Sequence, residues 1–244
     1  MSFKTKLRTI YALLILPSFL HAQQSPGDSS SRIDRWSVVS IAQKQLAGNL
    51  RLFTGAEYIR NGQHARGYPF FQSELPLDGS VIYDGASYEH IPLQYDLVTG
   101  EVVTHDSMND ANISLVHEKL TRFTISGHTF IWLPAAGDSA ATLDPGYYEL
   151  LDDGPYTLVA RHEKKIVYPT TTEEIMKYVA SDSYFLEQPN NQYARIEGEH
   201  SLLKILADKK ELVKKFIRQN KLNFNKAPGD MLVQVIHYYT QLKN

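Results

Sequence analysis

The chain has 244 residues, of which 43% are hydrophobic and 21% charged, and its formal net charge is −2. These values are typical of a soluble globular protein and give no electrostatic reason to expect a nucleic acid as partner. The chain contains no cysteine, which excludes disulfides and thiolate metal sites and leaves packing as the source of stability.

Residues 1–22 have the pattern of a secretory signal peptide. Three basic residues within the first eight positions precede an apolar run from Ile10 to Leu20, and the small residue Ala22 follows. The run is about half the length that a membrane span needs, and no later apolar run reaches about 18 residues. The pattern predicts export to the periplasm or the outside of a bacterial cell, with no transmembrane helix after cleavage.

The segments after the leader differ in composition. Residues 23–33 are rich in Ser, Gly and Pro, which predicts a disordered spacer. We expect residues 34–244 to form a single domain that opens with a short helix at 36–46. Its body, up to residue 200, is expected to be mostly β, and residues 201–244 are expected to be helical.

Short β-prone runs alternate with turn residues from residue 50 to about residue 196, including a β-prone stretch at 52–59. Hairpin turns are expected at Asp84-Gly85, Thr99-Gly100, Ser126-Gly127, Asp152–Gly154 and Pro189–Asn191. The one helix expected in this region covers 171–179, where two threonines precede two glutamates. Hairpins without long intervening helices predict an antiparallel meander of about eight to ten strands. This sheet is expected to curl into a partial barrel or to split in two.

Two amphipathic helices are expected at the C-terminal end. Asp208 and Glu211 have the spacing of a capping box for the first helix, and Pro228 begins the second. Each helix has one apolar face, so each is expected to pack on the sheet or on the other helix. The predicted fold class is therefore α+β, an antiparallel β-meander followed by two C-terminal amphipathic helices.

Four phrases of this sequence resemble uncharacterised exported proteins of Bacteroidota. They are VIYDG at 81–85, IPLQYD at 91–96, GYYELL at 146–151 and the tail from Leu202 to Tyr239. The resemblance implies export and a β-rich body with a helical end. Because that group has no assigned activity, the resemblance supplies no catalytic residues.

Catalytic and metal-binding motifs are incomplete in this chain. His117–Thr121 lacks the second histidine of a zinc-peptidase helix, and Ser201–Lys204 lacks the companion motifs of penicillin-recognising enzymes. Asp152–Gly154 lacks the ligands that follow in a calcium loop. The sequence predicts no catalytic residues, no metal site and no cofactor.

Two groups of residues are candidates for ligand binding. His105 and Asp106, with Asp110 nearby, form the most polar loop cluster, for which a metal ligand, a general base and a plain surface turn are alternatives. Tyr68, Phe70 and Phe71 follow a glycine and are candidates either for an aromatic platform or for core packing.

The leading hypothesis is an exported, non-enzymatic binding or structural module. Its partner is expected to be an envelope protein, a glycan or a small apolar ligand. One alternative is a lipid or apolar-ligand carrier with a curved sheet. Another is a hydrolase with a scattered site that includes His105, Asp106 and His128, because catalytic groups assemble in space and not in sequence.

Overall fold

A computed structural model describes residues 51–135, 143–168, 170, 175–189 and 192–243 of this chain. The predicted leader, the predicted spacer and the predicted helix at 36–46 lie outside the described residues and stay predictions.

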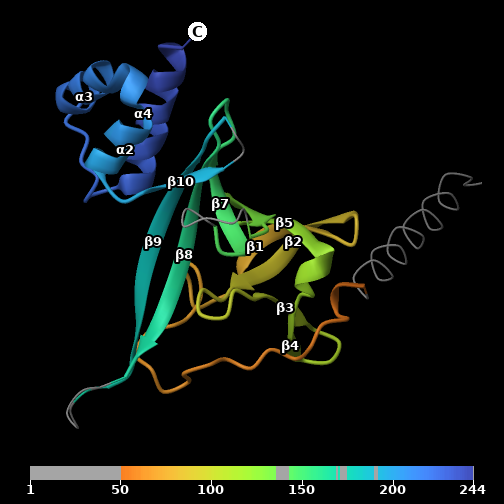
Figure 1. Ribbon diagram of the computed structural model, residues 1–244. Helices are drawn as coiled ribbons and strands as arrows, with labels where there is room; N and C mark the ends of the chain where they lie inside the picture. The colour runs from red at the N-terminus through yellow and green to blue at the C-terminus, as the bar shows by residue number, and fades with distance from the viewer. Residues whose placement is uncertain (1–50, 136–142, 169, 171–174, 190–191, 244) are drawn as a thin grey trace, which may run out of the picture. The chain divides into compact units, whose positions relative to one another are not determined.

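One antiparallel sheet of ten strands forms the body of the protein (Figure 1), which confirms the α+β prediction. The sheet is not closed, and its order is β10-β9-β8-β7-β6-β5-β1-β2-β3-β4. Its strands are β1 (Leu77–Tyr83), β2 (Ala86–Tyr95), β3 (Val102–Asp106), β4 (Ala111–Ser114), β5 (Leu120–Ile125), β6 (His128–Leu133), β7 (Gly146–Asp152), β8 (Leu158–Val167), β9 (Lys177–Glu187) and β10 (Tyr193–Ile196).

The strand order departs from a simple meander at one point. Strands β1 to β4 follow one another, but β5 pairs with the free side of β1 and not with β4. The chain makes this return through the 3-10 turn His117–Lys119. Strands β5 to β10 then continue the sheet on the other side of β1.

Two of the expected hairpin turns have the backbone geometry that their residues predict. Asp84 and Gly85 have φ values of 51° and 75°, and Ser126 and Gly127 have φ values of 51° and 84°. Two successive positive φ values match the right-handed twist of the flanking strands, and Gly adopts them without strain.

Two local predictions within the β-rich body are wrong. Residues 52–59 form no strand, and only Glu57 makes an isolated antiparallel bridge, to Ile113 of β4. The helix expected at 171–179 is absent where it can be seen, because β9 begins at Lys177; residues 171–174 lie outside the described part of the chain.

Residues 55–72, which we call the bridging segment, connect distant strands. Ser114 N of β4 donates to Ala56 O at 2.9 Å, and Arg66 N donates to Met176 O, beside β9, at 2.7 Å. Phe71 N donates to Tyr95 O of β2 at 2.8 Å. Gly55 allows the close approach to β4, since a Cβ there would lie 1.8 Å from Ser114 O. The bridging segment therefore reaches from the β4 side of the sheet to β9.

Two large core clusters form on the sheet. The aromatic cluster belongs mainly to β1, β2, β5 and β6, and its aromatic members are Phe71, Tyr83, Tyr88, Tyr95, Phe123, Phe130 and Tyr147. The aliphatic cluster joins β8, β9 and β10 to the C-terminal helices through residues such as Leu158, Leu186, Leu202, Val213 and Leu232.

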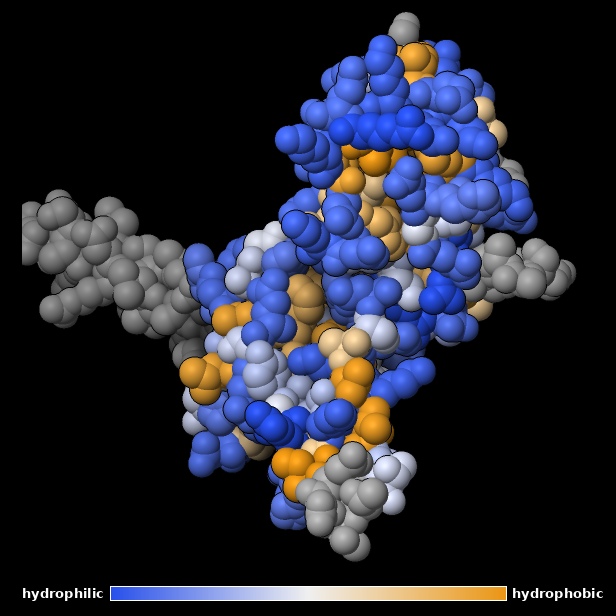
Figure 2. All heavy atoms as spheres, turned by 90° about the vertical axis from the view of Figure 1, so that its left-hand side faces the viewer, coloured by the Kyte–Doolittle hydropathy of each residue, from blue (hydrophilic) through white to orange (hydrophobic). Residues whose placement is uncertain are grey.

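Three helices, one more than expected, follow the sheet: α2 (Glu199–Ile205), α3 (Lys210–Gln219) and α4 (Pro228–Gln241). The predicted capping box at Asp208 is wrong, since no side chain caps α3. The Asp208 carboxylate instead accepts hydrogen bonds from the Tyr239 hydroxyl and from Lys243 Nζ, both at 2.8 Å. Figure 2 shows mainly hydrophilic side chains over the visible face of the helices, which agrees with their buried apolar stripes.

Candidate functional site

A pocket opens where strands β7 and β8 separate. Their pairing ends at Glu149 and Ala160, whereas β8 stays paired with β9 as far as Val167 and Lys177. Beyond Ala160, Lys164 N of β8 donates instead to Leu97 O, which follows β2, at 2.9 Å. This change of partner leaves a space between the start of β7 and residues 161–163 of β8.

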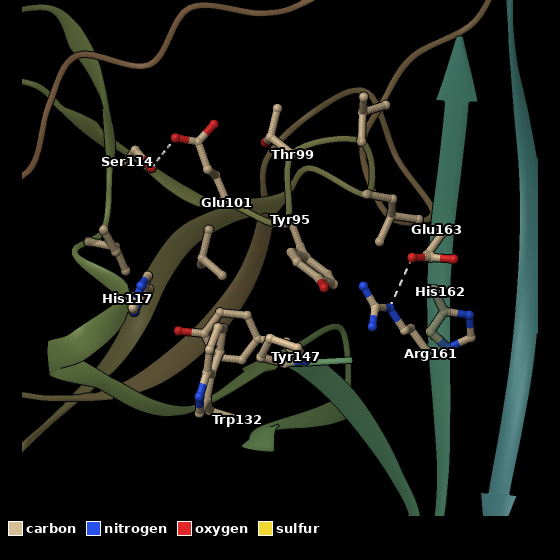
Figure 3. A pocket seen from close by; sticks show the side chains of 17 residues that line it. Tyr95, Thr99, Glu101, Ser114, His117, Trp132, Tyr147, Arg161, His162 and Glu163 are labelled. Atoms are coloured by element: carbon tan, nitrogen blue, oxygen red, sulfur yellow. Dashed lines mark hydrogen bonds and ion pairs between the residues drawn. The ribbon is translucent and has the colours of Figure 1, made fainter. Parts of the chain in front are cut away.

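The pocket has a volume of about 290 Å³ and an aromatic floor (Figure 3). Tyr147 lies edge-on to both neighbouring rings, with centroid distances of 6.1 Å to Tyr95 and 5.0 Å to Trp132. His117 stacks on Trp132 at 4.9 Å, with an angle of 9° between the planes. Burial raises the pKa values of Tyr95 and Tyr147, so both hydroxyl groups keep their protons.

Polar side chains stand on two opposite walls of the pocket. On β8, Arg161 Nε lies 3.0 Å from Glu163 Oε1, and on the other wall the Ser114 hydroxyl donates to Glu101 Oε1 at 3.0 Å (Figure 3). Arg161 Nη1 also donates to the Tyr148 hydroxyl at 3.2 Å. Burial lowers the pKa of Arg161, but the Tyr148 hydrogen bond and the nearby carboxylates outweigh it and raise the pKa overall.

Asp96 positions the loop between β2 and β3 that forms one side of the pocket. Its buried carboxylate accepts hydrogen bonds from Val98 N at 2.7 Å, from Thr99 N at 3.2 Å and from the Tyr58 hydroxyl at 2.6 Å. A carboxylate that accepts several hydrogen bonds fixes the turn around it. The loop is therefore held in place both by its own turn and by the bridging segment.

A second polar cluster runs across four adjacent strands. Glu149 of β7 accepts hydrogen bonds from His128 Nδ1 of β6 and from His162 Nε2 of β8, the latter at 2.7 Å. His162 Nδ1 lies 2.7 Å from Asp182 of β9, and His128 Nε2 lies 2.8 Å from the side-chain amide of Gln72. We call this set the imidazole–carboxylate chain.

The hydrogen bonds of the imidazole–carboxylate chain determine the protonation state of His162. Both nitrogens of His162 face carboxylate oxygens, so both carry protons and the ring is an imidazolium. Burial lowers the pKa of His162, but the hydrogen bonds to Asp182 and Glu149 outweigh it and raise the pKa to about 9. Both ring nitrogens of His128 are also occupied, one by the Gln72 side-chain amide and the other by Glu149.

The imidazole–carboxylate chain has no free ring nitrogen. Burial raises the pKa of Glu149, but the hydrogen bonds from His162 and His128 outweigh it and lower the pKa, so the carboxylate is ionised. Among the described residues, no Ser, Thr or Tyr hydroxyl hydrogen-bonds to either imidazole. The arrangement thus has the features of a structural link between strands and lacks the bonded nucleophile of a catalytic triad.

His105 and Asp106, which the sequence placed on a loop, end strand β3 and do not border the pocket. His105 Nδ1 lies 3.1 Å from Asn112 Oδ1, and Asp106 accepts from Met108 N at 2.9 Å. The Asn109 side chain also donates to Asp106 and lowers its pKa. These contacts belong to the β3–β4 turn, and none of them joins His105 to His128.

Tyr68, Phe70 and Phe71, for which an aromatic platform and core packing were the alternatives, lie in the bridging segment. Phe70 and Phe71 are buried, and the Phe71 ring packs on His128 and His162 with centroid distances of 5.1 and 5.3 Å. The Tyr68 hydroxyl donates to Gln72 O at 2.8 Å, and Lys164 Nζ lies 4.4 Å from the Tyr68 ring centre. None of the three lines the pocket, and their role in binding stays a prediction.

The sequence reasoning missed the residues of the pocket walls and most of the imidazole–carboxylate chain. Glu149 carried a usable signal, because it interrupts the apolar run Tyr147–Leu151 at a position that faces the same side as Tyr147. Arg161 and Glu163 carried none, since charged residues also alternate along an ordinary solvent-exposed strand.

In the described part of the chain, no three His, Asp or Glu residues are grouped so that they could hold a metal ion. None of the described helices is both long enough and apolar enough to cross a membrane. Comparison of this chain with protein-family models, with curated proteins and with solved structures finds no match.

Proposed function

We propose that this chain is an exported, non-enzymatic binding protein and that the pocket between β7 and β8 receives a small ligand. The predicted signal peptide supports export. The pocket supports binding, because an aromatic floor with a few convergent polar groups is the usual composition of a small-ligand site.

The elements around the pocket favour a site that exists before the ligand arrives. Asp96 holds the β2–β3 loop, and the bond from Lys164 N to Leu97 O ties that loop to β8. A preformed site loses less conformational entropy when its ligand binds. The saturated hydrogen bonds of the imidazole–carboxylate chain favour binding over catalysis.

The test is a screen of small polar and aromatic compounds by two-dimensional ¹H–¹⁵N NMR spectroscopy. We expect bound compounds to shift the signals of residues 97–102 and 161–163 and of the Trp132 indole. Thr99→Trp, at the exposed edge of the pocket, is expected to abolish these shifts, whereas Ser87→Trp, an exposed residue outside the pocket lining, is expected to leave them unchanged. A screen without hits, or hits that Thr99→Trp does not affect, would contradict the proposal.

A further inference from the structure

The chemistry of the pocket narrows the class of ligand, and this step rests on the proposed function. The floor consists of Trp132, which is partly exposed and offers an apolar surface, and of Tyr95 and Tyr147, which are only 4% and 3% exposed and support it from below. Aromatic side chains of this kind favour a flat partner with C–H groups on one side. The floor alone fits either an apolar ring or the apolar side of a sugar ring.

The two walls favour hydroxyl groups. Among the described residues, Glu163 on one wall forms an ion pair with Arg161, and Glu101 on the other accepts one hydrogen bond from Ser114 (Figure 3). A carboxylate has about four acceptor positions, so each retains capacity for a further donor. Arg161 Nη2 has no acceptor among the described residues and adds a donor beside Glu163. A hydroxyl group both donates and accepts, and it therefore matches adjacent donors and acceptors of this kind.

The charges on the walls favour a neutral ligand. Arg161 and Glu163 neutralise each other in an ion pair at this wall, so a cationic or an anionic ligand group there would compete with one member of the pair for the other. On the opposite wall Glu101 adds a further negative charge, which repels anions. A neutral molecule that carries several hydroxyl groups avoids both penalties.

The volume sets the size of the ligand. About 290 Å³ corresponds to about ten water molecules at about 30 Å³ each, which is room for one sugar ring with its hydroxyl groups. We infer that the pocket binds a single ring of a neutral saccharide, with its C–H face on the floor, chiefly on Trp132, and its hydroxyl groups on Arg161, Glu163 and Glu101.

Trp132 provides the readout. The chain has two tryptophans, Trp36 and Trp132, so Trp36→Phe leaves the pocket residue as the sole indole. This protein is titrated with the methyl glycosides of glucose, galactose and mannose and with N-acetylglucosamine. Cyclohexanol, glucuronate and glucosamine serve as the apolar, anionic and cationic comparison compounds.

We expect at least one neutral saccharide to change the Trp132 emission saturably and to bind more tightly than all three comparison compounds. Glu163→Gln and Glu101→Gln are expected to weaken that binding about tenfold, because hydrogen bonds to an ionised acceptor are stronger than those to an amide. Glu187→Gln, on β9 and outside the pocket lining, is the matched control and is expected to leave the affinity unchanged.

The outcomes separate the two proposals. If cyclohexanol binds as tightly as every saccharide, or if no saccharide binds while the NMR screen still finds ligands in the pocket, the saccharide inference is overturned and the binding function stands. If neither experiment finds a ligand in the pocket, both are overturned.

Discussion

The two large core clusters cover the same sheet in different ways. Phe130 of the aromatic cluster is paired with Glu149, and Glu149 is paired with Ala160 of the aliphatic cluster, so the three side chains share one face. Helices cover the aliphatic cluster, where only Tyr184 and Tyr239 are aromatic among fifteen buried residues. The bridging segment and loops contribute to the aromatic cluster, where seven of fifteen buried residues are aromatic.

This difference explains where the pocket lies. Helices present regular ridges of medium-sized side chains that fill the space above a sheet closely. Irregular segments lack such ridges, and large rings fill the space beneath them less regularly. The pocket adjoins the aromatic cluster, and the imidazole–carboxylate chain lies at the border between the two clusters.

The largest loss of stability is expected from a substitution in the aromatic cluster. Phe130 is fully buried and contacts the rings of Tyr95, Phe123 and Phe71, so Phe130→Ala is expected to lower the free energy of unfolding by about 4 kcal/mol. Urea unfolding followed by circular dichroism measures the loss. Ile82→Ala, at a partly exposed position on β1, is the control. An equal loss in both variants would show that the aromatic cluster contributes no more to the free energy of unfolding than a partly exposed position does.

A slightly smaller loss is expected beneath the helices. Leu232 of α4 is fully buried, so Leu232→Ala is expected to lower the free energy of unfolding by about 3 kcal/mol. Leu212→Ala, on the exposed side of α3, is the matched control and is expected to change it little. We expect the far-ultraviolet and near-ultraviolet circular dichroism signals to change in one transition, as they do when the two clusters form one cooperative unit. Separate transitions would contradict this.

The stability that His162 contributes at the border between the two clusters is expected to depend on pH. The folded-state pKa of His162 is about 9, above its ordinary value of about 6.5, so the stability from its charge is fully present below about pH 6.5. That stability, up to about 3 kcal/mol, is lost as the pH rises through 9.

Urea unfolding of the wild type and of His162→Gln at several pH values between 6 and 9.5 tests this expectation. The difference between the two proteins is expected to shrink as the pH rises. A difference that stays constant over this range would mean that the charge of His162 does not stabilise the border between the clusters.

The smallest effect is expected at the end of the chain. Lys243 Nζ lies 2.8 Å from Asp208, but both side chains are exposed, and exposed ion pairs contribute little because water and salt screen them. Lys243→Ala is expected to leave the urea midpoint unchanged within error. A clear decrease that disappears in 1 M salt would show that the helices depend on this ion pair.

The sequence allowed the hairpins to be predicted but not the pocket. Asp84-Gly85 and Ser126-Gly127 specify their turns locally, because few other residue pairs adopt two positive φ values. The pocket depends instead on a change of partner by β8, in which Lys164 N donates to Leu97 O, a residue that is distant in sequence. No local pattern predicts such a long-range contact.

The wrong helix at 171–179 has a related cause. Its residues have a local helical pattern, but Lys177–Val179 pair with Lys165–Val167 of β8. Tertiary pairing outweighs weak local preferences of this size. Phe70 and Phe71 illustrate the same limit for the site, since their residue types fit both a platform and a core and only the fold shows that they are buried.

The bridging segment also affects the order in which the chain folds. It precedes every strand that it contacts, and its bridge from Arg66 reaches Lys177, more than a hundred residues further along the chain. Closing so long a loop is entropically costly until the intervening hairpins have shortened it. The bridging segment, although it is synthesised before every strand that it contacts, is therefore expected to be among the last parts of the domain to reach its native position.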